Sequence, residues 1–163
     1  MATSWGLAPF AAPLQAQETA AANRANATLS LPAPSGPYAA GSRWLALVDS
    51  SRIDSLAPTP GAQRQILVRV WYPAAPVHGA QLVPLWPAGL RFTRALSAGF
   101  GLPDSTFDRI ATVPSHTYAD APVARRGRPF PVVLFSHGYA QGFESQNSVQ
   151  MEELASHGYV AVS

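Results

Sequence analysis

The sequence contains no cysteine, no lysine and no long hydrophobic segment. The lack of cysteine excludes thiol nucleophiles, disulfides and cysteine-ligated metals. No run of about 18 apolar residues occurs, so the sequence predicts no membrane-spanning helix. All basic residues are arginine and the formal net charge is only +2, which gives no indication of a nucleic-acid partner.

The remaining composition is that of a globular protein. Hydrophobic residues make up 47% of the 163 residues and charged residues 12%, which predicts one domain with ample core material. Residues 1–35 differ, because they are rich in Ala, Pro, Ser and Gln without a clear period. We expect them to form a flexible leader. The apolar stretch at 5–14 resembles an export signal, but no basic residue precedes it, so secretion, a periplasmic location and a cytoplasmic one stay open.

Two segments in the first half predict strands. Residues 43–49 are short and apolar, and residues 64–72 are rich in β-branched and aromatic side chains. A Pro/Gly turn separates the segments, so we expect an antiparallel pair at one edge of a sheet. The even-numbered side chains of the second segment are the more apolar set, and we expect them to face the core.

The next region, residues 74–127, shows no convincing strand. The pattern predicts a short helix from Pro87 to Gly99 and another that begins at Asp104 or Ser105. The region carries many large apolar side chains. They either cover one face of the sheet or form a lid or acyl-chain entrance.

The second half predicts a strand, turn, helix and strand in succession. The first strand, 130–136, contains a continuous apolar run, which is typical of a strand buried on both faces. An apolar stripe then indicates a helix, with Asn147 and Gln150 resembling a capping box and with Glu152 and Glu153 facing water. Gly158 is suited to end it, and residues 159–162 predict a strand parallel to the first through a right-handed crossover.

The turn between them, His137-Gly138-Tyr139, carries the candidate chemistry. Ligands of open α/β sheets bind at the carboxyl ends of strands, where this turn is expected. Gly138 would allow a close approach of the backbone, and the Tyr139 N–H would be placed to stabilise an oxyanion. His137 would either steady this loop or be a structural histidine. A second Ser-His-Gly, at 156–158, coincides with a predicted helix end.

Other polar groups give no second site. His78, His116 and His157 show no metal-ligand spacing with one another or with carboxylates, and no cofactor is predicted. The basic cluster Arg125, Arg126 and Arg128 lies in a Gly/Pro loop, where it is either solvated or an anion site.

The segment Phe130-Pro-Val-Val-Leu-Phe-Ser-His-Gly-Tyr-Ala, followed by Leu154-Ala-Ser-His-Gly-Tyr-Val-Ala-Val162, resembles the platelet-activating factor acetylhydrolase-like branch of the α/β-hydrolases. Dienelactone-hydrolase and cutinase-like esterases share that architecture. The resemblance covers about residues 36–163. It implies an α/β-hydrolase sheet and a serine esterase acting on phospholipid-like or other lipophilic esters, with the backbone N–H of Tyr139 in the oxyanion hole.

The sequence departs from that family at the nucleophile. No Gly-x-Ser-x-Gly occurs, and residues 138–142 have the glycine spacing but Ala140 in the central position. We therefore expect 36–163 to be the amino-terminal part of the domain, ending before the nucleophile, acid and base, and inactive alone. The alternatives are a non-catalytic α/β module that binds lipid or a partner through 84–110, or a truncated remnant. The oligomeric state is not predicted.

Overall fold

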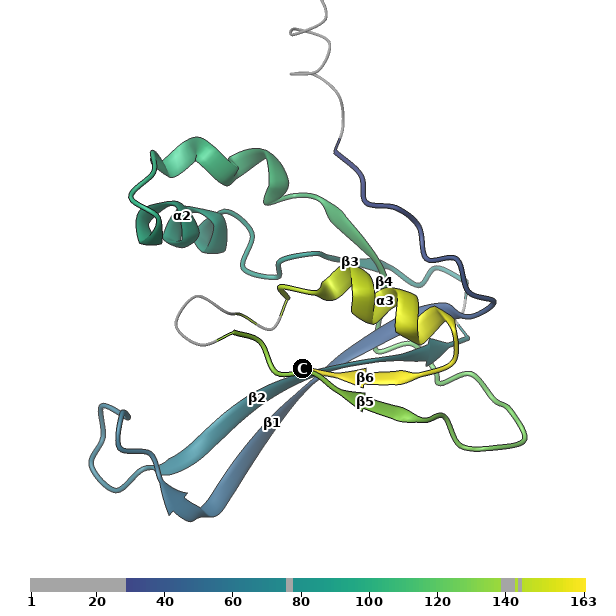
Figure 1. Ribbon diagram of the computed structural model, residues 1–163, viewed down its shortest axis with the longest axis horizontal. Helices are drawn as coiled ribbons and strands as arrows, with labels where there is room; N and C mark the ends of the chain where they lie inside the picture. Colours follow the sequence, from purple (N-terminus) through teal and green to yellow (C-terminus); the bar gives the residue numbers. More distant parts are fainter. Residues whose placement is uncertain (1–28, 76–77, 139–142, 144) are drawn as a thin grey trace, which may run out of the picture.

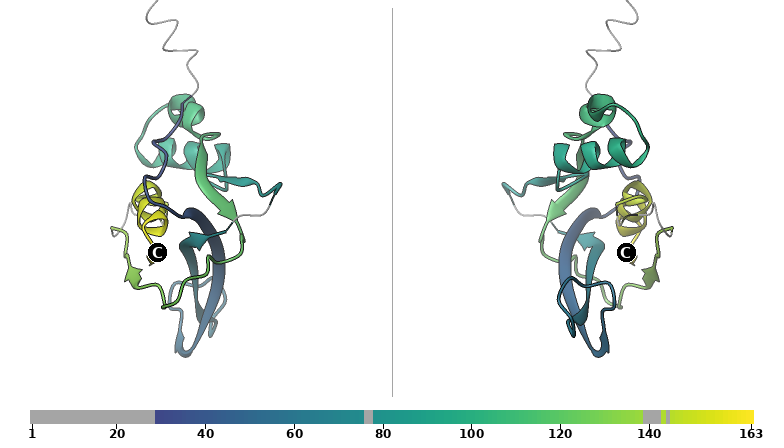
Figure 2. Two further views of the ribbon diagram at one scale, coloured as in Figure 1. Left: turned by 90° about the vertical axis from the view of Figure 1, so that its right-hand side faces the viewer. Right: turned by 90° about the vertical axis from the view of Figure 1, so that its left-hand side faces the viewer.

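The computed structural model describes residues 29–75, 78–138, 143 and 145–163. In these residues a mixed sheet has the strand order β3-β4-β1-β2-β6-β5, and helices lie beside it (Figures 1 and 2). The elements, in chain order, are β1 Ala39–Ile53, β2 Gln63–Ala74, β3 Leu82–Pro84, α2 Leu90–Gly99, the 3-10 helix η1 Asp104–Ile110, β4 Pro114–Ala119, β5 Val132–Leu134, α3 Ser148–Ser156 and β6 Val160–Val162.

Strands β1 and β2 form the predicted antiparallel pair, but they lie inside the sheet and not at its edge. Their register runs from Ala39 opposite Ala74 to Asp49 opposite Arg64. β4 pairs in parallel with β1, β6 pairs antiparallel with β2, and β3 pairs antiparallel with β4. The prediction that residues 74–127 contain no strand is therefore wrong. Strand β4 escapes sequence analysis because its two buried side chains, Ser115 and Thr117, are small and polar.

The predicted strand, helix and strand unit is confirmed in β5, α3 and β6. β5 and β6 are parallel, with Val132 opposite Val160 and Leu134 opposite Val162. α3 ends at Ser156, and Gly158 follows with φ +90, a conformation that glycine adopts without strain. The helix begins after Asn147, but no side-chain hydrogen bond caps it, so the expected capping box does not form.

The core lies between α3 and the sheet, on the side that carries the odd-numbered residues of β2. Trp71 is fully buried there. The other buried members of this cluster are Ala40, Met151, Ala155 and Ala161. The expectation that the even-numbered side chains of β2 face the core is wrong for this cluster. Ile66 is 40% exposed, whereas the even-numbered Tyr72 belongs to a smaller cluster on the opposite face.

The face of the sheet opposite α3 is open near β5. Val132 is 61% exposed and Leu134 is 79% exposed. Burial of this strand on both faces was expected, and the described residues do not provide it. The reason is that β5 is an edge strand of the described sheet, and no described helix covers this face of it.

Helices α2 and η1 lie together at one end of the molecule (Figures 1 and 2). Both occupy segments where the sequence predicted helices. Thr93 and Ser97 are fully buried, and the Ser97 hydroxyl donates to the carbonyl oxygens of Thr93 and Asp104, which joins α2 to η1. Trp86 packs on Phe92 with ring centroids 5.3 Å apart. None of the helices in the described part of the chain has the length and apolarity that a membrane crossing requires.

Candidate functional site

The candidate loop leaves the sheet at the carboxyl end of β5. The Phe135 N–H still donates to the Val162 carbonyl oxygen at 2.8 Å, so the ladder extends one residue beyond the strand. Ser136, His137 and Gly138 then depart from it, and all three are exposed. This position, at the end of a strand in a parallel pair, is where ligands of α/β sheets bind.

Within this loop the described interactions are local. His137 Nδ1 lies 3.0 Å from the Gly138 carbonyl oxygen, a contact that restrains the imidazole ring beside its own backbone. A Cβ at Gly138 would meet no described atom within 4 Å, so packing in this part of the chain does not demand a glycine there. Tyr139 and Ala140 lie outside the described residues. The oxyanion role of Tyr139, and the supporting roles of His137 and Gly138, stay predictions.

A buried carboxylate, missed by sequence analysis, joins α3 to β4. Glu152 was expected to face water, but it is only 1% exposed. Its Oε2 accepts from the His116 N–H at 3.1 Å, and its Oε1 accepts from the Thr117 hydroxyl at 2.9 Å. The His116 ring extends the network, because its Nε2 donates to the Leu31 carbonyl oxygen at 3.0 Å. The expected solvated pair of Glu152 and Glu153 is therefore one buried and one half-buried group.

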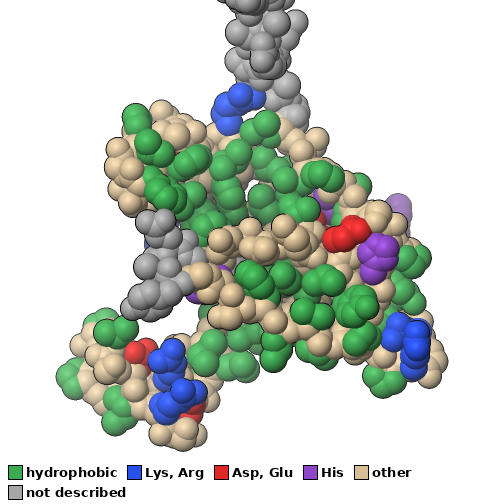
Figure 3. Space-filling model, in the orientation of Figure 1, with side chains coloured by type: hydrophobic (Ala, Val, Ile, Leu, Met, Phe, Trp, Pro, Cys, Tyr) green, Lys and Arg blue, Asp and Glu red, His purple; other side chains and the backbone are tan. Residues whose placement is uncertain are grey.

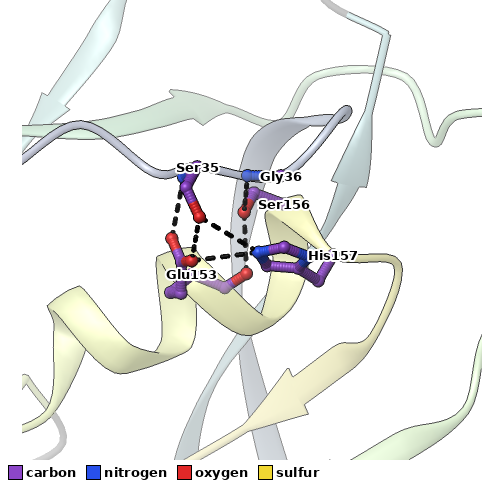
Figure 4. Close-up of polar contacts among 5 residues, drawn as sticks. All are labelled: Ser35, Gly36, Glu153, Ser156 and His157. Atoms are coloured by element: carbon purple, nitrogen blue, oxygen red, sulfur yellow. Dashed lines mark hydrogen bonds and ion pairs between the residues drawn. The ribbon is translucent and has the colours of Figure 1, made fainter.

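Glu153 instead binds the segment that precedes β1 (Figure 4). The Ser35 N–H and hydroxyl donate to its two carboxylate oxygens at 2.9 Å and 2.5 Å, and His157 Nε2 lies 3.0 Å from Oε1. The Ser35 hydroxyl and backbone N–H, followed by His157, hold the pKa of the Glu153 carboxyl below its ordinary value. The Gly36 N–H donates to the Ser156 hydroxyl at 3.0 Å.

The serine, histidine and carboxylate of this cluster have the composition of a catalytic triad but not its geometry. In a triad one imidazole nitrogen faces the serine and the other faces the acid. Here His157 Nε2 faces both Ser35 Oγ, at 3.2 Å, and Glu153 Oε1. The Ser35 hydroxyl also donates to the carboxylate itself, so it has no path for giving its proton to the histidine. The cluster is a clamp between the segment that precedes β1 and α3.

A buried arginine lies near the carboxyl end of β6. Arg69 is 1% exposed, with its guanidinium carbon 4.7 Å from the ring centroid of Trp71 and 5.4 Å from that of Trp44. Its backbone N–H and carbonyl pair with Ser163 at 2.9 Å each. The expectation that the even-numbered side chains of β2 face the core implied the outer face for Arg69. The burial of Arg69 could have been found from the antiparallel register of β1 and β2, because this register sets Trp44 opposite Arg69.

Histidines and carboxylates elsewhere do not gather. Within residues 29–75, 78–138, 143 and 145–163, no group of three such side chains could hold a metal ion. The buried Glu152 has hydrogen-bond donors around it and not further carboxylates.

Two comparisons with known proteins identify relatives of the chain. Residues 23–163 match the sequence profile of the family described as platelet-activating factor acetylhydrolase, isoform II. The chain belongs to this family. The structure of a ferulic acid esterase from Streptomyces cinnamoneus is similar, with a TM-score of 0.59 and 29% sequence identity. The match covers 83% of this chain and 36% of the esterase chain. None of the curated proteins compared with the chain matches it significantly.

These matches give the fold. The mixed sheet with its crossover helix is part of an α/β-hydrolase fold, as the sequence predicted. The family and the structural neighbour are both those of hydrolases that cleave esters. The chain spans about a third of the length of the solved esterase that it matches.

Proposed function

We propose that this chain supplies the oxyanion loop of a serine carboxylesterase of the platelet-activating factor acetylhydrolase type. The substrate would be a lipophilic or phospholipid-like ester. A serine hydroxyl from outside residues 1–163 would attack the ester carbonyl, and its proton would pass to a histidine. The Tyr139 N–H would donate to the oxyanion, the alcohol would leave with the proton, and water would then release the acid from the acyl-enzyme.

One observation carries this proposal. Residues 136–138 leave the sheet at the carboxyl end of β5, within the segment that matches an esterase family. A backbone donor following this point would face the space beyond the parallel strand ends, where a substrate carbonyl would bind. The serine, histidine and acid found together, at Ser35, His157 and Glu153, do not have triad geometry and so do not supply the nucleophile.

Hydrolysis of a p-nitrophenyl ester tests the proposal. We expect the purified 163-residue chain to show no turnover that a serine-reactive phosphonate abolishes. Such turnover would refute the location of the nucleophile outside these residues. A polypeptide translated from the coding sequence extended past Ser163 is expected to hydrolyse the ester, and complete inactivity of that product would refute the esterase itself.

Tyr139→Pro in the extended polypeptide removes the donor, and Tyr139→Ala is its control because it keeps the N–H. Loss of one oxyanion donor lowers kcat by about 10²–10³-fold. We therefore expect the proline variant to lose that much and the alanine variant to stay within a few-fold of the parent. Equal losses of kcat in both variants would show that the Tyr139 N–H takes no part in the mechanism.

A second candidate function is non-catalytic binding of lipid or a partner through residues 84–110. The observation in its favour is the exposure of three large apolar side chains on and after α2: Leu90, Phe100 and Leu102. Vesicle binding by the extended polypeptide, lost on replacing these residues by serine and unaccompanied by ester hydrolysis, would favour this function over the esterase.

A further inference from the structure

A surface pocket lies at the amino ends of β5 and β6, away from the loop at their carboxyl ends. Its volume is about 420 Å³. Two arginines, a histidine and two aromatic rings contribute to its wall, namely Arg126, Arg128, His157, Phe130 and Tyr159. In Figure 3 a basic patch lies at the right of the molecule, below an acidic and a histidine side chain, and a second basic patch lies at the lower left.

The guanidinium of Arg126 is held in place before any ligand arrives. Its Nε donates to the Arg128 carbonyl oxygen at 3.0 Å, and its Nη2 donates to the Pro129 carbonyl oxygen at 2.6 Å. The guanidinium carbon lies 4.4 Å from the centroid of the Phe130 ring. A Cβ at Gly158 would lie 3.4 Å from Nη1, an ordinary van der Waals contact. A charged fork fixed in this way loses little side-chain entropy when it binds an anion.

The positive charge of this loop is not neutralised by the described part of the chain. The ion pairs found there involve other arginines and His157, and none includes Arg125, Arg126 or Arg128. Glu153 is the carboxylate in contact with the His157 that lines the pocket, and its oxygens already accept from Ser35 and His157. A pocket whose two arginines form no ion pair with a described carboxylate favours an anionic ligand.

We propose that this pocket binds the phosphate group of an anionic ligand, with Arg126 and Arg128 as the two cationic contacts. Arginine matches phosphate oxygens through its planar fork of N–H donors. The volume exceeds that of a bare phosphate, so an organic group attached to the phosphate would extend toward Phe130 and Tyr159. The ligand is a soluble phosphomonoester or the phosphate headgroup of a lipid, since both present the same oxygens. This site is independent of the proposed esterase function.

Titration of the 163-residue chain tests the site with matched variants. Arg128→Gln removes a charge whose side chain has no described hydrogen bond, so folding should be unaffected. Arg125→Gln removes the same charge three positions away, on an exposed side chain that does not line the pocket. The probes are inorganic phosphate and glycerol phosphate at constant ionic strength, measured by calorimetry. Vesicles of phosphatidylcholine with and without phosphatidic acid form the lipid arm, measured by sedimentation.

We expect Arg128→Gln to weaken binding about tenfold and Arg125→Gln to leave it within twofold. If the two variants differ in this way with the soluble phosphates, the site binds a phosphomonoester. If they differ only with the vesicles, the site binds a lipid headgroup. Equal weakening by both variants would show attraction by net charge only and would overturn the proposal. Absence of binding in both arms would overturn it as well.

Discussion

Replacing Thr117 by valine tests whether the Glu152 carboxylate joins α3 to β4. The Thr117 hydroxyl is fully buried and donates to Glu152 Oε1 at 2.9 Å, while the His116 N–H donates to Oε2. A hydrogen bond to a charged group contributes about 1.5–3 kcal/mol to stability, because the buried charge has no water to replace a lost donor. Valine keeps the shape and removes the donor. We therefore expect Thr117→Val to lower the free energy of unfolding by about 2 kcal/mol.

This loss corresponds to a fall in melting temperature of about 4–8 °C for a chain of this size. Thermal unfolding followed by circular dichroism would measure it. Thr106→Val is the matched control, since it removes an exposed hydroxyl that donates to the Pro103 carbonyl oxygen. Water replaces that partner, and we expect a change within about 0.5 kcal/mol.

A double-mutant cycle locates the effect in the pair. Glu152→Gln removes the charge that strengthens the Thr117 hydrogen bond, so Thr117→Val should cost less in that background, with a coupling of about 1 kcal/mol. Thr117→Val and Thr106→Val with equal melting temperatures would refute the reasoning. Additive effects of Thr117→Val and Glu152→Gln would refute it independently.

Two further predictions concern the contact between the segment that precedes β1 and α3. A Cβ at Gly36 would lie 2.2 Å from the Ser156 carbonyl oxygen, so we expect Gly36→Ala to destabilise the chain by about 1–3 kcal/mol in chemical denaturation, whereas Gly99→Ala, in open space, should be neutral or slightly stabilising. Because folding lowers the pKa of Glu153, its contribution to stability is present above the ordinary value of 4.5 and is lost as pH falls through the folded pKa. The melting temperatures of the parent and Ser35→Ala should therefore differ at neutral pH and converge in acid, and a difference that persists unchanged in acid would contradict this assignment.

The carboxyl-terminal unit was predictable because several local signals agree there. The apolar residues of β5 and β6 are contiguous, and Gly158 has the positive φ that a helix end requires. Local pattern could not reveal β4, since Ser115 and Thr117 are buried polar residues satisfied by partners distant in sequence. When buried side chains are polar and hydrogen-bonded, the strand that carries them shows no hydrophobic periodicity by which it could be predicted.

The polar groups were harder to place than the elements that carry them. The burial of Glu152 depends on β4, and that of Arg69 depends on a cross-strand partner, Trp44. Neither contact is visible from the residue's own neighbours in sequence. The candidate loop was placed at a strand end because the strand before it was recognisable, but its chemistry rests on Tyr139, which lies outside the described residues.

The clamp between Ser35 and Glu153 also has a consequence for the order in which the chain assembles during synthesis. The two residues are 118 positions apart. At about 5–20 residues per second, Ser35 would be synthesised roughly 6–24 s before Glu153. Until α3 has been made, Ser35 and Gly36 have no helix end to bind. The contact between Ser35 and Glu153 can therefore form only after α3 has been synthesised.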